Sequence, residues 1–286
     1  MGIADDILSH PSAALAALAY QLDLGADETI GDTPIDRFAE AAKPAPVAMT
    51  ARGLAPTPAS RPGRTDADAS PDPGPDPGPD PRVDPVAVAR AMAEAAADLD
   101  GLRLAIQGYD LCDLKKGARN TVFADGNPGA RVMIVGEAPG REEDLEGLPF
   151  VGRAGQLLDR MFAAIGLSRR SPDAQSALYI TNVMPWRPPQ NREPDAGEIA
   201  MMRPFLERHI ELVDPVLIVV MGNTPCQALL NQKGILRLRG HWMQGLGRPV
   251  MPMTHPAYLL RTPGAKREAW ADLQQIEARL KENEKV

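Results

Sequence analysis

The stretch RVMIVGEAPG (131–140) decides the fold, because a short apolar run ends there in a turn built from two glycines and a proline. A short run rich in valine and isoleucine predicts a buried strand, and the Gly and Pro residues predict a tight turn at its carboxyl end. Glu137 stands in that turn. Taken alone, the pattern is more typical of a strand-ending turn with a solvated carboxylate than of a functional site.

Three further apolar runs follow, LYITNVM (178–184), VLIVVMG (216–222) and PVMPMTH (249–255). Patterns of helical spacing lie between them, near 154–165, 195–212 and 223–231, and a last one covers 266–283. This alternation predicts a three-layer α/β/α domain with a central, mostly parallel four-stranded sheet. In such a sheet the ligand crevice lies beyond the carboxyl ends of the strands, where Glu137, Asn182 and His255 stand.

Composition divides the chain into three parts. Apolar residues between 14 and 22 repeat near helical spacing, which predicts a helical module at 1–43. The part at 44–84 is rich in Pro, Asp and Gly and contains PDPGPDPGPDPRVD (71–84), which predicts a disordered linker. The composition of the acidic repeat favours a spacer over a binding motif. The N-terminal module is a candidate binding site for an unidentified partner. A catalytic domain is predicted at 85–286.

Charge is distributed unevenly along the chain. The formal net charge is −7, but residues 1–100 carry 17 acidic and 7 basic side chains, a net −10, which leaves +3 for residues 101–286. The mildly basic part is compatible with DNA as a ligand. No apolar run is long enough to span a membrane, and the first residues lack a basic start before the apolar segment. We therefore expect a cytoplasmic monomer with Cys112 and Cys226 as free thiols.

Four motifs resemble those of family-4 uracil-DNA glycosylases in order and approximate spacing. They are VGEAPG (135–140), EEDLEGLPFVGRAGQLLD (142–159), ITNVMPWRPPQNREP (180–194) and THPAYLLRTP (254–263). The resemblance covers residues from about 85 to 286. It implies hydrolysis of the N-glycosidic bond of uracil in single- or double-stranded DNA, which leaves an abasic site. The motifs contain no lysine to form a Schiff base, so a monofunctional enzyme is expected.

The residue types suit the tasks of such an enzyme, which must flip a base out of DNA, hold it and identify it. Phe150 offers a ring for stacking, although an ordinary core Phe is the alternative. Asn182 offers an amide that can pair with N3–H and O4 of uracil, although Asn is also common in turns. A neutral His255 can donate to O2 as negative charge develops on the leaving base.

Other roles rest on the resemblance alone. Glu137 is expected to position the attacking water or to stabilise the cationic sugar. Gly136 and Ala138 are expected to surround the uracil, and Glu143 to exclude the methyl group of thymine.

The segment after His255 is expected to contact DNA. Tyr258, Leu259 and Arg261 combine bulky apolar groups with a cation, which suits a wedge in the base stack and a phosphate contact. Ala257 stands where the family usually has Ser, which removes one hydroxyl from the expected phosphate contacts.

The sequence departs from the family at its iron–sulfur site. Family-4 enzymes hold a [4Fe–4S] cluster with four cysteines, whereas the matching positions here are Tyr109, Cys112, Trp186 and Met202. One thiolate cannot hold a cluster that takes four ligands, so no cofactor is expected. We predict instead that the three replacements form an apolar plug around Cys112. The alternative is three independent, partly exposed replacements.

Other functions fit parts of the same pattern. One is a non-catalytic module that binds uracil-containing or single-stranded DNA, and another is a glycosylase for a different deaminated base. A third is a protein that binds a free nucleotide at the GEAPG turn. A uracil-DNA glycosylase releases uracil from an oligonucleotide, whereas a non-catalytic module retains the oligonucleotide without releasing the base.

Overall fold

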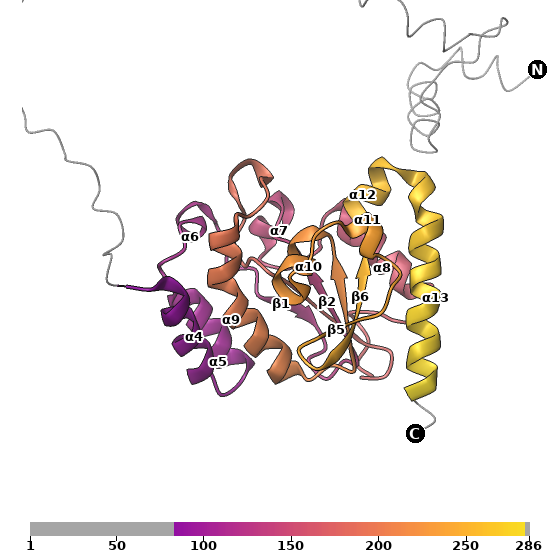
Figure 1. Cartoon of the computed structure of the whole chain (residues 1–286), viewed down its shortest axis with the longest axis horizontal. Helices are drawn as coiled ribbons and strands as arrows, with labels where there is room; N and C mark the ends of the chain where they lie inside the picture. The colour runs from indigo at the N-terminus through magenta and orange to yellow at the C-terminus, as the bar shows by residue number, and fades with distance from the viewer. Residues whose placement is uncertain (1–82, 284–286) are drawn as a thin grey trace, which may run out of the picture. The chain divides into compact units, whose positions relative to one another are not determined.

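The computed structural model describes residues 83–283 (Figure 1). The predicted helical module at 1–43 and nearly all of the predicted linker at 44–84 lie outside these residues. Within them, no helix is long and apolar enough to cross a bilayer.

The described residues form a six-stranded sheet in the order β1-β3-β2-β4-β6-β5. The four inner strands are parallel and correspond to the four predicted runs, which confirms the fold class. The predicted strand count of four was too low, because a short antiparallel strand flanks each side. The strands are β1 (Ala124–Gly126), β2 (Val132–Gly136), β3 (Leu178–Asn182), β4 (Leu217–Met221), β5 (Met243–Gly245) and β6 (Arg248–Met253).

Helices cover both faces of the sheet. They are α4 (Pro85–Ala95), α5 (Leu99–Gly108), α6 (Leu114–Gly117), α7 (Arg141–Glu146), α8 (Arg153–Ala163), α9 (Ala196–Val213), α10 (Asn223–Leu230), α11 (Ile235–Leu238), α12 (Pro256–Arg261) and α13 (Lys266–Asn283), with short 3-10 turns η1 (Pro189–Asn191) and η2 (Pro263–Ala265). In Figure 1, α4, α5 and α9 gather on one side of the sheet and α13 on the other.

Alternating side chains of the inner strands build two separate apolar clusters. Val132 and Ile134 of β2 pack with α8, α12 and α13, whereas Met133 and Val135 pack with α4, α5, α9 and α10. Both faces of each inner strand are therefore buried, which explains why these strands are continuous apolar runs rather than alternating ones.

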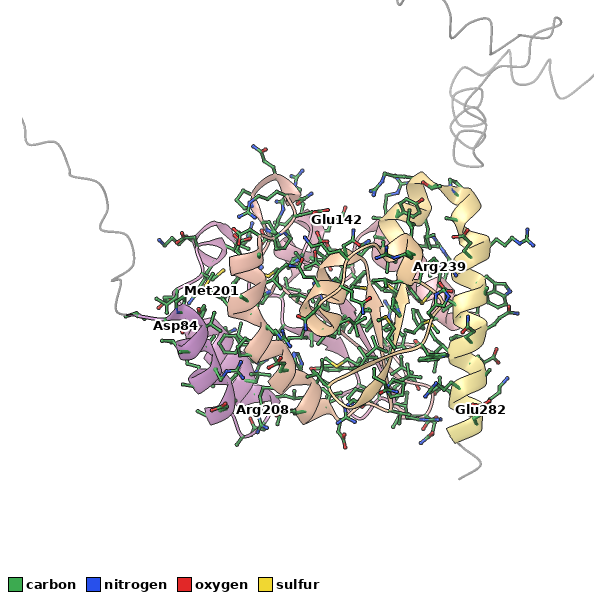
Figure 2. The ribbon with its side chains drawn as sticks, in the orientation of Figure 1. Asp84, Glu142, Met201, Arg208, Arg239 and Glu282 are labelled. Carbon is green, nitrogen blue, oxygen red and sulfur yellow. The ribbon has the colours of Figure 1, made fainter. Side chains whose placement is uncertain are left out.

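Polar contacts fix the outer helices. The Asp84 side chain accepts hydrogen bonds from the backbone N–H groups of Val86 and Ala87 and so caps the start of α4. On the other side, Arg239, which is labelled in Figure 2, pairs with the fully buried Asp272 and joins α13 to the segment before β5. A buried carboxylate needs such a partner, because an unpaired charge in the core is costly.

Candidate active site

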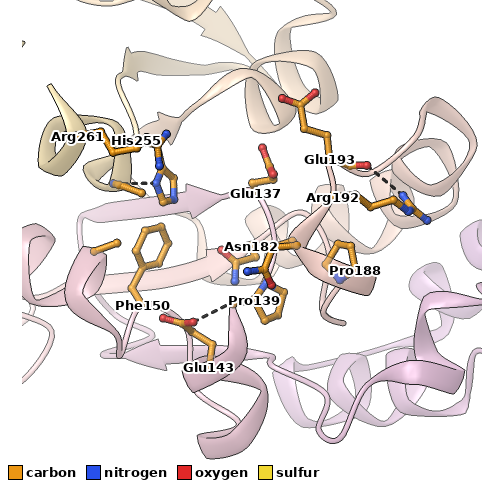
Figure 3. Close-up of a pocket in the computed structure, with 15 residues that line it drawn as sticks. Glu137, Pro139, Glu143, Phe150, Asn182, Pro188, Arg192, Glu193, His255 and Arg261 are labelled. Atoms are coloured by element: carbon orange, nitrogen blue, oxygen red, sulfur yellow. Dashed lines mark hydrogen bonds between the residues drawn. The ribbon is translucent and has the colours of Figure 1, made fainter. Parts of the chain in front are cut away.

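A cavity of about 440 Å³ opens at the carboxyl ends of the parallel strands. Each inner strand delivers polar groups to this edge directly or just beyond its last residue, as the fold class predicts. Seven of the predicted site residues line the cavity, namely Glu137, Ala138, Glu143, Phe150, Asn182, His255 and Arg261. Figure 3 shows Phe150, Asn182, Glu137 and His255 around one space.

Gly136 does not line the cavity but packs against two side chains that do, and this close packing excludes a side chain of its own. It is the last residue of β2 and pairs with Asn182, the last residue of β3. A Cβ atom at position 136 would lie 2.3 Å from Oδ1 of Asn182 and 2.5 Å from the ring of Phe150. Glycine is therefore required for these two side chains to lie together at the end of the sheet.

The amide of Asn182 is available to a ligand. The residue is only 8% exposed, and within the described part of the chain its side-chain oxygen and nitrogen have no hydrogen-bond partner in the protein. The side chain lines the cavity, so its amide can be reached by a ligand. It offers one acceptor and two donors to whatever occupies the cavity.

His255 presents a neutral imidazole. Its Nδ1 accepts a hydrogen bond of 3.2 Å from the backbone N–H of Ala257, so the proton of the neutral ring is on Nε2. Burial, together with the nearby positive charge of Arg261, lowers the pKa of His255 to about 4, while Glu143 acts weakly in the opposite direction. At neutral pH the ring is therefore an uncharged hydrogen-bond donor.

Phe150 packs against His255. The two rings are stacked with centroids 5.4 Å apart and an angle of 26° between their planes. A base sandwiched between them would need roughly 7 Å, twice the carbon–carbon contact distance. A ligand can therefore use only the part of the Phe150 ring that points away from His255.

Glu137 has a partner that the sequence did not reveal. The hydroxyl of Thr224, at the start of α10, donates a 2.7 Å hydrogen bond to Oε2 of Glu137. Burial raises the pKa of Glu137, the bond from Thr224 opposes that rise, and the charge of Glu193 adds to it. The position of Thr224, three residues beyond the end of β4, was the available signal, because β4 ends at the same edge as β2.

Glu143 makes backbone contacts that the sequence did not indicate. One carboxylate oxygen accepts from the backbone N–H groups of Val151 and Gly152, at 3.1 and 3.0 Å, and the other accepts from Gly140 at 3.0 Å. The carboxylate therefore fixes the backbone around Phe150. Exclusion of the thymine methyl group by Glu143 stays a prediction.

The predicted DNA-contacting residues separate into two groups. Arg261 is exposed and lines the cavity, and Tyr258 is half-buried beside it. Leu259 is wrong as a wedge, because it is fully buried in the apolar cluster beneath α12. In a short helix only some of the adjacent apolar residues face outward, and here Leu260 is more exposed than Leu259.

The four positions expected to replace the cluster cysteines are all buried. Tyr109, Cys112, Trp186 and Met202 belong to one apolar cluster, and none is more than 1% exposed. The alternative of partly exposed replacements is therefore wrong.

The polar atoms of these side chains are also satisfied. The Tyr109 hydroxyl donates to the carbonyl of Pro85 at 2.8 Å, and Nε1 of Trp186 donates to Thr121 at 3.1 Å. Burial raises the pKa of the Cys112 thiol. These residues do not fit an iron–sulfur cluster, since only one of them is a thiol, and the described residues contain no group of three or more His, Cys, Asp or Glu side chains placed to hold a metal ion.

A loop between β3 and α9 forms one wall of the cavity with residues that were not predicted as site residues. Pro188, Asn191, Arg192 and Glu193 all line it. Arg192 is held by two hydrogen bonds to Glu198 on α9. The sequence identified this segment only as a motif and gave no indication of which side chains face inward.

Comparisons with known proteins agree with this geometry. Residues 123–274 match the model of the uracil DNA glycosylase superfamily. The chain is 38% identical over 187 residues to a type-4 uracil-DNA glycosylase of Archaeoglobus fulgidus. The matched region covers 62% of this chain and 91% of that protein. It is 40% identical over 153 residues to the type-4 enzyme of Thermotoga maritima, with 52% and 77% coverage, and 35% identical over 193 residues to that of Saccharolobus solfataricus, with 64% and 87% coverage. With a cavity at the expected edge of the sheet and a family match over more than half of its length, this chain belongs to the uracil DNA glycosylase superfamily.

Proposed function

We propose that the chain is a monofunctional uracil-DNA glycosylase, which hydrolyses the bond between uracil and deoxyribose in single- or double-stranded DNA. The observation that carries the proposal is that the amide of Asn182 and the neutral imidazole of His255 line one cavity. The amide suits the Watson–Crick edge of uracil, and the imidazole suits its O2. The similarity to type-4 enzymes over most of their own length supports the same substrate class.

Base recognition follows from the amide. Its oxygen accepts from N3–H of a flipped uracil while its nitrogen donates to O4. Cytosine presents the reverse pattern at these two atoms and pairs with the amide only after the amide rotates by 180°. The edge of the Phe150 ring beside Gly136 gives the base an apolar surface to rest on.

The reaction breaks the bond between C1′ of the sugar and N1 of uracil, and the base departs as an anion. Nε2–H of His255 donates to O2 as this charge develops, which is stabilisation by a preorganised donor. A water molecule then bonds to C1′ and loses a proton to solvent. Thr224 occupies one oxygen of Glu137, and the other oxygen is left to orient that water or to stabilise the cationic sugar.

Single-turnover release of uracil tests the proposal. The full chain, in excess, is mixed with end-labelled oligonucleotides that carry one uracil, one cytosine or one thymine at the same position, each as a single strand and as a duplex. Alkali then cleaves abasic sites. We expect cleavage only at uracil, and an Asn182→Ala preparation purified in parallel controls for contaminating glycosylase. Retention of the uracil strand without cleavage would identify a binding module instead.

A further inference from the structure

We propose that Arg169, which does not line the cavity, is a positioning residue that holds Phe150 in its place against the flipped base. The inference rests on the proposed function. Arg169 lies between α8 and β3, and its side chain is only 8% exposed. It was not among the residues that the sequence pointed to.

Phe150 has an unusual backbone conformation. Its φ angle is +54°, in the left-handed region that bulky residues rarely adopt. Such a conformation persists only where the surrounding structure enforces it, and it is found mostly at functional sites. Close packing at Gly155 is part of that enforcement, because a Cβ atom there would lie 1.7 Å from the carbonyl oxygen of Phe150.

Two oppositely charged side chains hold the peptide groups on either side of Phe150. The guanidinium of Arg169 donates from Nη1 to the carbonyl of Pro149 at 2.8 Å and from Nη2 to the carbonyl of Phe150 at 3.0 Å. The carboxylate of Glu143 accepts from the next two N–H groups, those of Val151 and Gly152. Four successive residues are therefore fixed, two through their carbonyls and two through their amides.

Arg169 is itself held in a fixed orientation. Its Nε donates to Asp159 on α8 at 2.8 Å, and its Nη1 also donates to Asp125 on β1 at 3.0 Å. A guanidinium presents several N–H groups in one rigid plane, so it can bond two carboxylates and two carbonyls together, which a lysine ammonium cannot do in the same geometry. The short edge strand β1 thereby becomes part of the support for the site.

The kinetic test compares three variants of the full chain in single-turnover uracil release. Arg169→Met should lower the rate at saturating enzyme by between ~10-fold and ~10²-fold, the scale of a misplaced contact in an active site. Arg169→Lys should also be slow, because it keeps the charge but loses the fork. Arg170→Met removes the same charge from an exposed neighbour and should leave the rate unchanged.

A double-mutant cycle separates positioning from a general structural role. If Arg169 acts through Phe150, Arg169→Met should slow a Phe150→Ala enzyme by less than about twofold, because the ring that Arg169 positions is already gone. Full multiplication of the two losses would overturn the proposal, as would a wild-type rate in both Arg169 variants.

Hydrogen exchange supplies a readout that does not depend on glycosylase activity. The amides of residues 151 and 152 should exchange faster in Arg169→Met than in the wild type, while those of β2 and β4 keep their protection. Should Arg169→Met fail to fold, Arg169→Lys serves in its place, since it retains a cation beside Asp125 and Asp159. A wild type that releases no uracil would remove the proposed function, yet faster exchange at 151 and 152 would still support the clamp, and unchanged exchange would overturn it.

Discussion

Gly136 and Asn182 are register partners at the ends of the adjacent parallel strands β2 and β3, and their contact leaves no room for a Cβ atom at position 136. Gly136→Ala should therefore displace the Asn182 amide or the Phe150 ring and slow uracil release by ~10²-fold, the scale of a misplaced catalytic geometry. The measurement is the single-turnover rate beside a thermal melt. Gly117→Ala is the matched control, because nothing lies within 4 Å of a Cβ atom at that position. A near-wild-type rate in Gly136→Ala would show that the packing around Gly136 can relax.

His255→Ala should slow uracil release by ~10²-fold or more while the protein stays folded, because it removes one preorganised donor to O2. Single-turnover kinetics and circular dichroism together check this. Wild-type rates in the variant would take His255 out of the mechanism.

Asn182→Asp should weaken discrimination between uracil and cytosine. An ionised carboxylate only accepts hydrogen bonds, so it loses the donor to O4 of uracil and gains an acceptor for the amino group of cytosine. The measurement is the ratio of excision rates on matched uracil and cytosine oligonucleotides. If this ratio does not change, another residue reads the base.

Stability should fall as the pH decreases below about 6.5. Burial lowers the pKa of His209 from 6.5 to about 3, so between these values the unfolded chain binds a proton that the folded chain does not. In this window His209 lowers the free energy of unfolding by about 1.4 kcal/mol per pH unit, and above it His209 contributes no pH dependence.

Urea unfolding at pH 8, 6.5 and 5 tests this dependence. His209→Gln keeps an acceptor for the Tyr179 hydroxyl, which lies 2.9 Å from the imidazole, and should flatten the decline. His241→Gln, at an exposed position, should not. Equal slopes in all three proteins would assign the pH dependence to other groups.

Trp186→Ala should destabilise the domain by ~3 to 5 kcal/mol, because it empties the centre of the apolar plug. Trp270→Ala is the control, since that ring is 42% exposed and should cost much less. Chemical denaturation gives both values. The purified protein should also be colourless and free of iron, and stoichiometric iron or a nearly neutral Trp186→Ala would contradict the plug.

The inner part of the fold was predictable because its signal is local. Four strands buried on both faces leave four apolar runs in the sequence. The edge strands β1 and β5 are three residues long and only partly buried, so they leave neither a run nor an alternation. Only their pairing with β3 and β6 makes them strands.

The candidate site likewise contains residues that the local sequence indicates and residues that it does not. Glu137, Asn182 and His255 were identifiable because each stands at or within two residues of the end of a strand and within a motif that resembles the family. Thr224 and Arg169 act through partners that are distant in sequence. Thr224 and Glu137, for example, are 87 residues apart, and no local sequence pattern encodes such a pairing. Leu259 was misplaced because composition does not tell which of two neighbouring leucines faces the core.

The buried plug has a consequence for how such a site can change over time. Replacing Trp186 alone by cysteine would empty a packed core at a cost of several kcal/mol and would supply, with Cys112, only two of the four thiolates that a cluster takes. The same holds for Tyr109 and for Met202, because each step loses packing before a cluster can form. Packing therefore opposes the appearance of a cluster site at these positions one residue at a time, because the stability of the core is lost before any metal can bind.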